Sequence, residues 1–537
     1  MKSKWLSTFT VLALGGLLVA CSNDAANDPK QNDDGTNLPD DEMKFTDTVE
    51  LSIPVYDRAF EGWNVSDNFY TRWIQEEFGD EHNISVNFVP IARASEVTDF
   101  QQLLAAGNAP DVIFHYDMPQ ALAYYDSDVL QPLDTDELAK YAPTYWENLK
   151  ETNEQFGVVD DQNMFFFADR PDVSNYTTVI RKDWVEQVGM KVEDLTSLEK
   201  LNEMAEKWKD AGLGTMGGGL TANIFNYNYA FRDWPIDPEY RALYSDLMVA
   251  DFTTEDTERW LKNLSYRYHN GLIDKEFYLR TDANQIKSEF VAGRTGIVGE
   301  YISYNTDLYT STLQNNPEAE FAVLPPYAEI PEGGVPQGRA NWPFGLIMGI
   351  NESATEEERV AVWLYLEWMS QPENLFFLQN GIEGENYTLD SDGIPIIETE
   401  FNGESALSMN NNKDYWALVT EAPYFETEEL TRKAMESFWS PPGFEYIVDD
   451  MFKYQDETRE YSIQDPLFTV VIDSQNDYQA DLNALFQELY LMVVMGPEDK
   501  FDENYEAAKE RYLNAGYQQI LDEKQAAIDE GKFNYFE

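Results

Sequence analysis

VELSIPV at residues 49–55, ISVNF at 84–88 and VIF at 112–114 are three short apolar segments near the start of the folded region. In the first two, apolar and polar residues alternate, which is the period of a β-strand with one buried face. The segments between them have the spacing of amphipathic helices. Short apolar strands that alternate with helices predict an α/β fold whose sheets are mostly parallel and covered by helices.

The two intervening helices carry start and stop signals. In the first, Ser66 is the expected N-cap and Gly79 the expected stop. In the second, Ser95 is expected to begin the helix and Gly107 to end it. The apolar stripe of the first helix consists of Phe69, Trp73 and Ile74.

Predicted strands and helices continue to alternate along the chain. A second unit is expected to begin with a strand at 177–180, and a turn-rich crossing at 325–338 precedes a strand at 344–350. The remaining predicted elements are helices at 184–188, 198–208, 259–268 and 286–290 and a strand at 296–298.

The C-terminal part is expected to be mainly helical. Ser353 and Glu356 have the spacing of a capping box, which predicts a helix running to Met369. From Asn410 onward the pattern favours an extended helical tail.

The N-terminus has the features of a lipoprotein signal peptide. Lys2 and Lys4 precede an apolar run at 5–20, which ends in Leu-Val-Ala before Cys21, the only cysteine of the chain. This pattern predicts cleavage before Cys21 and lipidation of that residue, for example with palmitate. An ordinary signal peptide with an incidental cysteine is the alternative.

The segment around Cys21 divides into two predicted parts. Residues 1–20 form the signal peptide, and residues 21–47, rich in Asn, Asp and Gly, form a lipidated disordered tether. The tether would hold the folded body at the outer face of the cell membrane.

Composition limits the possible functions. The 537 residues suffice for two or three domains, and a single cysteine allows no intrachain disulfide. With a net charge of −62, nucleic acid is excluded as a partner, because its phosphates would be repelled. Adaptation to a salty or alkaline exterior and a generally acidic secreted protein are two explanations of this charge.

Five motifs, in order along the chain, resemble the lipoprotein solute-binding components of bacterial ABC importers, in particular the LplA-like carbohydrate-binding branch. The sharpest match is the Gly-Ile-Glu-Gly-x-x-Tyr turn, because it is particular to that branch. The matching segments are GNAPDVI at 107–113, VIRKDW at 179–184 followed by VGM at 188–190, FVAGRTG at 290–296, GIEGENY at 381–387 and MGP at 495–497.

The resemblance implies a type II periplasmic-binding-protein fold with two lobes that close on a ligand. The first lobe is expected to comprise 48–175 and 340–405, and the second 176–339 and 406–537. The implied function is capture of a carbohydrate, expected to be an oligosaccharide, and its delivery to an ABC permease. The protein is expected to be a monomer with no cofactor, on a cell without a periplasm, most simply a Gram-positive one.

One family feature is missing from the sequence. Relatives often have an Asp/Asn-rich loop that binds calcium, and the corresponding segment here, 209–219, lacks alternating carboxylates. Asp390-Ser391-Asp392-Gly393 is predicted to be a turn, because it lacks a distal glutamate at the twelfth position. No metal site is therefore expected.

Candidate ligand-binding residues lie in loops at the carboxyl ends of strands and at lobe crossings, where ligands bind in open α/β sheets. Sugars need aromatic platforms and polar side chains. Trp342 is the first choice and Trp234 the second; core packing is the alternative for each aromatic residue, and an ion pair or solvated loop for each charged one. The full set is Trp63, Arg93, Tyr116, Asp117, Trp234, Glu300, Tyr301, Arg339, Asn341, Trp342 and Trp439.

Two other functions compete with transport. A surface-anchored polysaccharide-degrading enzyme would need a pair of positioned carboxylates, and no recognised catalytic motif accompanies the many acidic residues. A ligand-binding module for a membrane sensor would use the same closing lobes, so the sequence does not separate sensing from import. Residues 381–387 are expected to form a structural turn rather than a ligand contact.

Overall fold

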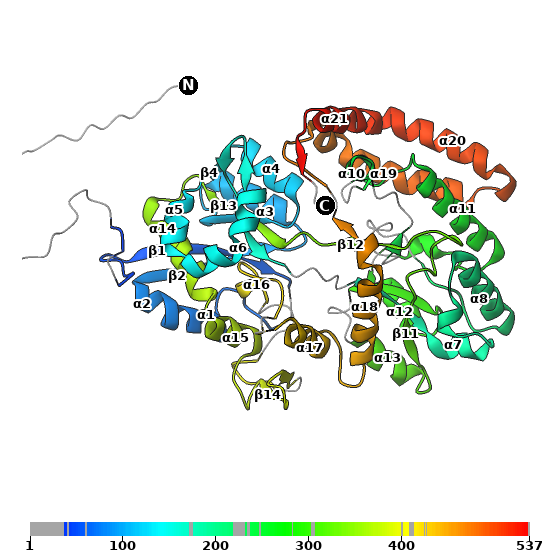
Figure 1. Ribbon diagram of the computed structural model, residues 1–537, viewed down its shortest axis with the longest axis horizontal. Coiled ribbons are helices and arrows are strands. Elements are labelled where there is room, and N and C mark those ends of the chain that lie inside the picture. Colours follow the sequence, from blue (N-terminus) through cyan, green and yellow to red (C-terminus); the bar gives the residue numbers. More distant parts are fainter. Residues whose placement is uncertain are drawn as a thin grey trace, which may run out of the picture. The chain divides into compact units, whose positions relative to one another are not determined.

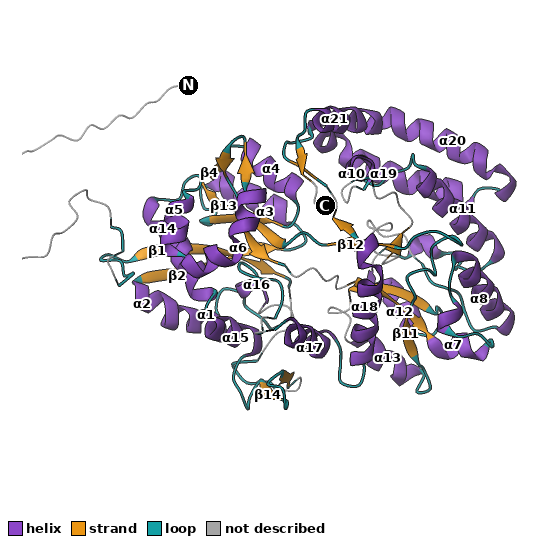
Figure 2. Ribbon diagram, viewed as in Figure 1, coloured by secondary structure: helices purple, strands orange, loops and turns teal. Residues whose placement is uncertain are grey.

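The structure is a computed structural model, shown in Figures 1 and 2, of which the first described residue is 37 and the last 534. Within these residues there is no helix that is both long and apolar enough to cross a membrane. The predictions for the signal peptide and for Cys21 lie outside the described residues. So do residues 40–41, 60–61, 171–175, 219–230, 233–236, 246–248, 282, 302–306, 399–400, 407–412, 424, 426 and 465.

Strands β1 (Val49–Asp57) and β2 (Ile84–Ala92) are the parallel pair that the alternating pattern predicts, with Val49 opposite Ile84 and Asp57 opposite Ala92. Both strands therefore end at the same edge. The strand predictions are confirmed, and both strands extend further than expected.

The helix between these strands begins and ends later than predicted. Asn68, not Ser66, is the N-cap, because its side chain accepts from two backbone amides while the Ser66 hydroxyl donates to the Phe88 carbonyl. The helical run continues past Gly79, where a Cβ atom would lie 2.6 Å from the Ile84 carbonyl oxygen, and ends at Asn83 with φ 58°. The run comprises α1 (Phe69–Ile74), a π-helical turn (Gln75–Gly79) and α2 (Asp80–His82).

The next strand joins a sheet with a different direction. The helix predicted from Ser95 to Gly107 is confirmed as α3 (Glu96–Ala106), and β3 (Val112–His115) follows. β3 pairs antiparallel with β13 (Phe344–Asn351), which also pairs antiparallel with β4 (Leu130–Gln131) and β7 (Phe166–Asp169).

The expectation of mostly parallel strands is therefore wrong for this sheet. β7 carries the chain out toward a crossing and β13 brings it back in, so the two must run in opposite directions. The apolar run of β13 is buried along its whole length, as a strand covered on both faces must be.

One large hydrophobic cluster surrounds these strands and is called the first core. It draws on 45–168, 344–378 and 415–419, together with Leu467. Besides α1 and α3, its helices are α4 (Met118–Asp126), α5 (Thr135–Tyr141), α6 (Pro143–Phe156), α14 (Glu356–Met369), α15 (Pro372–Asn380) and α16 (Lys413–Trp416).

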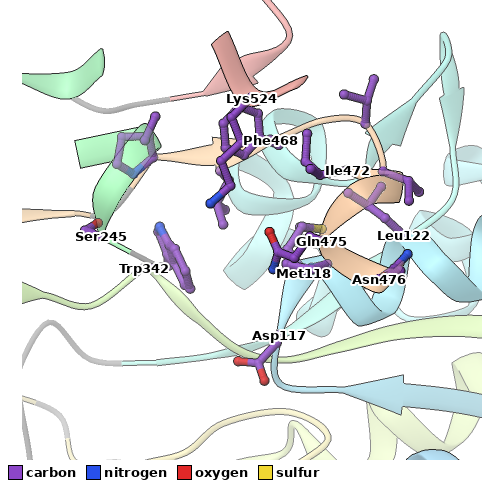
Figure 3. Close-up of a pocket in the computed structure, with 16 residues that line it drawn as sticks. Asp117, Met118, Leu122, Ser245, Trp342, Phe468, Ile472, Gln475, Asn476 and Lys524 are labelled. Atoms are coloured by element: carbon purple, nitrogen blue, oxygen red, sulfur yellow. The ribbon is translucent and has the colours of Figure 1, made fainter. Parts of the chain in front are cut away.

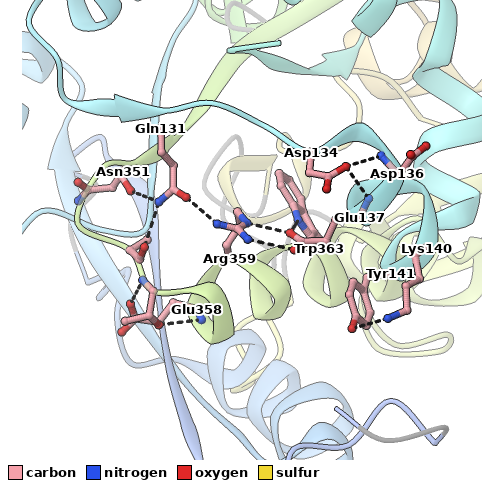
Figure 4. A network of polar contacts seen from close by, with 12 residues as sticks. Gln131, Asp134, Asp136, Glu137, Lys140, Tyr141, Asn351, Glu358, Arg359 and Trp363 are labelled. Atoms are coloured by element: carbon pink, nitrogen blue, oxygen red, sulfur yellow. Dashed lines mark hydrogen bonds and ion pairs between the residues drawn. The ribbon is translucent and has the colours of Figure 1, made fainter. Parts of the chain in front are cut away.

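A polar network holds α14 against α5 and β4 within the first core (Figure 4). The Arg359 guanidinium donates to both carboxylate oxygens of Glu137, at 2.8 and 3.0 Å, and to Gln131 Oε1 at 2.7 Å. The capping box of α14 is formed by Thr355 and Glu358 rather than by Ser353 and Glu356. Ser353 instead donates to the Asn351 side chain.

A second sheet has hydrophobic cores on both faces. Its centre is β8 (Tyr176–Arg181), with β10 (Ile297–Tyr301) and β11 (Phe321–Val323) antiparallel on either side. Alternate residues of a strand point to opposite faces, so Ile180 lies in the second core and Val179 in the third.

Helices form these two cores. The second core includes residues of α7 (Lys182–Gln187), α8 (Leu198–Ala211), α11 (Glu255–Asn270), α19 (Asp473–Met495), α20 (Phe501–Tyr512) and α21 (Gln518–Asp529). The third core includes residues of α12 (Ala283–Val291), α13 (Asp307–Asn315), α17 (Glu428–Trp439) and α18 (Glu445–Thr458). The predicted helical tail is confirmed, and Figure 2 shows it as long purple ribbons.

Short elements complete the described chain. They are α10 (Pro238–Tyr244), β5 (Val158–Val159), β6 (Gln162–Asn163), β9 (Phe231–Arg232), β12 (Gln337–Ala340), β14 (Tyr387–Leu389), β15 (Pro395–Ile397), β16 (Ile463–Gln464), β17 (Leu467–Phe468) and β18 (Phe533–Asn534). Of all described strand pairs, β1 with β2 and β12 with β16 are parallel, and the others are antiparallel.

Three chain segments lie side by side between the first core and the sheet of β8. The Asp169 amide donates to the Val419 carbonyl at 2.9 Å, and the Glu421 amide donates to the Asp169 carbonyl at 2.8 Å. The Arg170 amide donates to the Pro343 carbonyl at 3.2 Å, and its Nε donates to Glu421 at 2.6 Å. These crossings connect regions with separate cores; the exact lobe boundaries stay a prediction.

Candidate functional site

An aromatic and cationic cluster lies where β1, β2 and β3 end. The rings of Tyr56 and Tyr116 are nearly parallel, 12° apart, with centroids separated by 6.2 Å. The Arg93 guanidinium lies 5.0 Å from the Tyr56 centroid and 5.5 Å from that of Tyr116. The ends of these three strands, which belong to two sheets, therefore bring together two of the predicted site residues, Arg93 and Tyr116.

Glu96 holds this cluster in place. Its buried carboxylate accepts from the Tyr56 hydroxyl at 2.8 Å and from Arg93 Nη1 at 2.9 Å. Burial raises the pKa of Glu96, and it also raises the pKa of Tyr56. The guanidinium is thus fixed beside the rings, while nearly half of the Arg93 side chain remains accessible to a ligand.

Asp117 connects the cluster to the start of α4. Its backbone amide donates to His115 Nδ1 at 2.9 Å, so this nitrogen acts as an acceptor. The Asp117 carboxylate lies 3.8 Å from the same nitrogen, and its side chain is 36% exposed. A ligand hydroxyl can therefore reach this carboxylate.

A pocket begins beside Asp117 and is lined by Trp342 on another side (Figure 3). The half-buried Trp342 ring stacks on Phe344, with centroids 5.8 Å apart and an interplanar angle of 8°. Packing on Phe344 fixes the plane of the indole, which gives the pocket a flat aromatic wall. The polar side chains that line it are Asp117, Ser245, Gln475, Asn476 and Lys524.

The C-terminal part of the chain supplies the opposite wall. The 466–472 segment runs past the pocket, with Leu467 in the first core and Ile472 in the second. Lys524 on α21 is only 3% exposed, and its ammonium lies 5.8 Å from the Phe468 ring. Figure 3 shows Lys524 and Phe468 together on the side of the pocket away from Asp117.

Glu523, next to Lys524, orders this wall. Its carboxylate accepts from the backbone amides of Asp473 and Ser474, both at 2.9 Å, and so caps the start of α19. Burial acts to raise the pKa of Glu523, but the hydrogen bonds from Ser474 and Asp473 outweigh it and lower that pKa. The cap positions Gln475 and Asn476 in the first turn of α19.

A family model described as bacterial extracellular solute-binding protein matches residues 73–376. The chain belongs to this family. The resemblance seen in the sequence is confirmed, and the protein is an extracellular solute-binding protein. Lipoprotein LipO of Bacillus subtilis (strain 168) is 21% identical to it over 411 residues, which cover 72% of this chain and 75% of LipO.

Solved structures of other solute-binding proteins share the fold. An HMO binding, ABC-transporter associated protein from Bifidobacterium longum infantis is 12% identical, with a TM-score of 0.64 over 90% of this chain and 99% of that chain. The alginate-binding protein AlgQ2, solved without calcium ion, is 15% identical, with a TM-score of 0.62 over 92% and 99%. The solute-binding protein therefore has the predicted two-lobed type II periplasmic-binding-protein fold.

The other predicted site residues of the solute-binding protein lie in different surroundings. Trp63 is half-buried against the first core, and the Asn341 carbonyl accepts from Gln464 Nε2 at 2.8 Å. Trp439 is 7% exposed in the third core, where its ring lies 6.0 Å from that of Phe452. Trp439 is not among the residues that line the pocket, so the alternative of core packing describes its position.

The remaining candidates cannot be placed by their side chains. Arg339 lies in β12 opposite Ile463, and Glu300 and Tyr301 lie in β10. Their side chains, and the whole of Trp234, lie outside the described part of the solute-binding protein.

Sequence reasoning missed the C-terminal wall of the pocket. Gln475 and Asn476 lie in the first turn of α19 and Lys524 lies in the middle of α21, far from the strand edges where ligands are expected; Ser245, at the end of α10, was missed as well. The signal that points to this wall is Lys524 itself, a charged residue within the apolar pattern of the last helix.

Two predicted turns are confirmed. Asp390 Oδ1 accepts from the amides of Asp392 and Ile394, at 2.8 and 2.9 Å, and Lys433 pairs with Asp390 at 3.2 Å. Gly381 has φ 76°, and a Cβ atom there would lie 2.4 Å from Asn386 Oδ1, so this turn requires glycine. The described residues contain no group of three or more His, Cys, Asp or Glu arranged to hold a metal ion.

Proposed function

We propose that this protein captures an oligosaccharide in the pocket beside Trp342 and delivers it to an ABC permease. The observation that carries the proposal is the combination of a fixed indole with several polar side chains around one pocket. A sugar ring has apolar C–H faces that pack on an aromatic plane and hydroxyls that need donors and acceptors.

The polar groups around the pocket suit hydroxyl recognition. Asp117 accepts hydrogen bonds, Lys524 donates them, and the Gln475 and Asn476 amides do both. Arg93 and Tyr116 extend the polar and aromatic surface along the strand edge next to Asp117. This extended surface supports a ligand of more than one sugar ring.

The crossings support closure around the ligand. Three adjacent segments join regions that have separate cores, which is the arrangement in which a few residues can absorb a hinge motion. We assign 48–175 and 340–405 to the first lobe, and 176–339 and most of 406–537 to the second. Residues 415–419 pack in the first core and belong with the first lobe instead. The pocket receives residues from both lobes, so a bound ligand would favour the closed arrangement.

The sequence supports attachment to the membrane through Cys21. A lipidated Cys21 and the tether that follows it would keep a monomeric binding protein near its permease, at a high local concentration. The predicted end of the tether at residue 47 is too late, because Phe45 packs in the first core. One relative, LipO, is itself described as a lipoprotein. The cell is expected to be Gram-positive, and mass spectrometry of the mature N-terminus tests the lipid.

Carbohydrate binding is tested by measuring unfolding temperature against a panel of neutral and acidic oligosaccharides. A binder raises the free energy of unfolding by about 2.7 kcal/mol at a hundredfold excess over its Kd. A sugar that binds is then labelled, and its uptake by cells with and without the gene tests delivery to the permease. Breakdown of the glycans without stabilisation by any of them would contradict the proposal.

A further inference from the structure

Much of the wall of the pocket is apolar. Besides Trp342, this apolar wall includes Leu122 from α4, Ile472, and Phe468, Val470 and Val471 from the 466–472 segment. These side chains offer no hydrogen bonds to a ligand. An occupant that reaches the apolar wall must bring apolar surface to it.

Both lobes leave part of this wall uncovered. Trp342 and Val471 are half-buried against the first core, while Phe468 and Val470 are half-buried against the second. Apolar surface from two separate cores therefore faces one cavity. Covering it would stabilise the molecule by removing that surface from water.

The backbone of residues 467–469 is engaged elsewhere. β17 pairs with β18, where Leu467 lies opposite Asn534 and Phe468 opposite Phe533, and the Thr469 amide donates to the Lys532 carbonyl at 3.1 Å. These backbone groups are directed to the C-terminal strand. The hydroxyls of a sugar ring pressed against the Val470 and Val471 side chains would find no donor or acceptor in them, which is unfavourable.

We propose that the pocket binds an aromatic ring carried by the sugar, so that the cargo is an aryl-substituted saccharide. This inference rests on the proposed carbohydrate function and adds a second recognition element to it. The sugar is held by Trp342 and the polar groups near Asp117 and Gln475, and its aromatic substituent packs among Phe468, Val470 and Val471, which line the same pocket.

The experiment compares matched ligands on the full-length protein. The Kd values of p-nitrophenyl and methyl glycosides of glucose, galactose, mannose and xylose are measured by calorimetry, with p-nitrophenol alone as a further probe. At least one p-nitrophenyl glycoside is expected to bind about tenfold or more tightly than its methyl partner, as burial of several apolar atoms in a pocket allows. No preference in any pair overturns the inference.

Variants locate the effect. Val471→Ser and Val470→Ser each place a hydroxyl in the apolar wall and are expected to bring the ratio of the two Kd values toward one. Val158→Ser is the matched control, since Val158 is 39% exposed on β5 and does not line the pocket. Circular dichroism checks that all three variants fold. If the ratio of the two Kd values is unchanged in both pocket variants, the aryl group does not bind at this wall and the assignment is overturned.

The outcomes separate this inference from the proposed function. If oligosaccharides without an aromatic group stabilise the protein and the p-nitrophenyl group adds nothing, carbohydrate capture stands and the aryl site is rejected. If p-nitrophenol alone binds as tightly as its glycosides and no oligosaccharide binds, the sugar-linked ligand and the proposed function are both rejected.

Discussion

Two tryptophans that look alike in the sequence have different roles in the structure. Trp342 is half-buried at the edge of the first core, stacks on one ring and lines a pocket with polar neighbours. Trp439, the last residue of α17, is almost fully buried in the third core. The difference shows that the neighbours of an aromatic residue, rather than its position at a crossing, decide whether it can serve a ligand.

The largest effect is expected when Trp439 is removed. Trp439→Ala leaves a cavity in the third core and should lower the free energy of unfolding by about 3–5 kcal/mol. Urea denaturation followed by circular dichroism measures this change. A loss below about 1 kcal/mol would show that Trp439 is not a core residue and would remove the contrast with Trp342.

A smaller effect on stability and a specific effect on binding are expected at Trp342. Trp342→Ala should weaken binding of any sugar identified by the thermal screen by about tenfold to a hundredfold, because the aromatic platform is lost. Calorimetry measures the Kd. Trp260→Ala is the control, since Trp260 is also half-buried but packs in the second core near Tyr490; equal weakening by both variants would contradict a ligand role for Trp342.

Two aspartates differ in burial as the two tryptophans do. Burial raises the pKa of Asp111 to about 7, although its carboxylate accepts from the Ser52 amide at 2.7 Å, whereas the Asp117 side chain is partly exposed at the pocket. Between about pH 4 and pH 7 the folded protein therefore binds a proton at Asp111 that the unfolded chain does not. This contribution stabilises the fold at lower pH and is lost as the pH rises through about 7.

Asp111→Asn should remove that contribution. The variant is expected to reduce the fall in unfolding free energy between about pH 5 and pH 7.5 by about 1–2 kcal/mol. Denaturation at the two pH values measures it. Asp117→Asn, which changes a carboxylate at the pocket surface, is the control, and an equal reduction in both variants would argue against burial as the cause.

The smallest effect is expected on the surface, away from core and pocket alike. Lys200 and Lys207 both pair with Glu203 on the exposed face of α8, and these hydrogen bonds lower the pKa of Glu203 to about 2. Such exposed pairs contribute little. Lys200→Ala should change neither the unfolding temperature nor the Kd measurably, and a clear change in either would show that surface charge matters more than burial in this acidic chain.

Local patterns predicted the elements of this fold well. Alternation in 49–55 and 84–88 is a local property, and it identified β1 and β2. The predicted N-caps Ser66 and Ser353 were wrong, because Asn68 and Thr355, each two residues further along, cap the helices instead. Sequence spacing alone does not tell which of two nearby polar residues is the cap. Strand direction depends on where the chain crosses between cores, which the local pattern does not contain.

The residues around the candidate pocket were predicted only in part, for a related reason. Arg93, Tyr116, Asp117 and Trp342 follow or precede strands, so the rule for strand ends found them. Lys524 reaches the same pocket through tertiary packing of the last long helix. Contacts between residues so distant in sequence leave no periodic pattern in either segment.

Segments that are far apart in the sequence build the pocket. The pocket includes Asp117, near the beginning, and Lys524, close to the end, and its wall is paired with β18 at 533–534. A chain that is still being synthesised or exported therefore lacks a finished pocket. In the proposed function, cargo is held only once residues 524–534 have folded against the rest of the pocket.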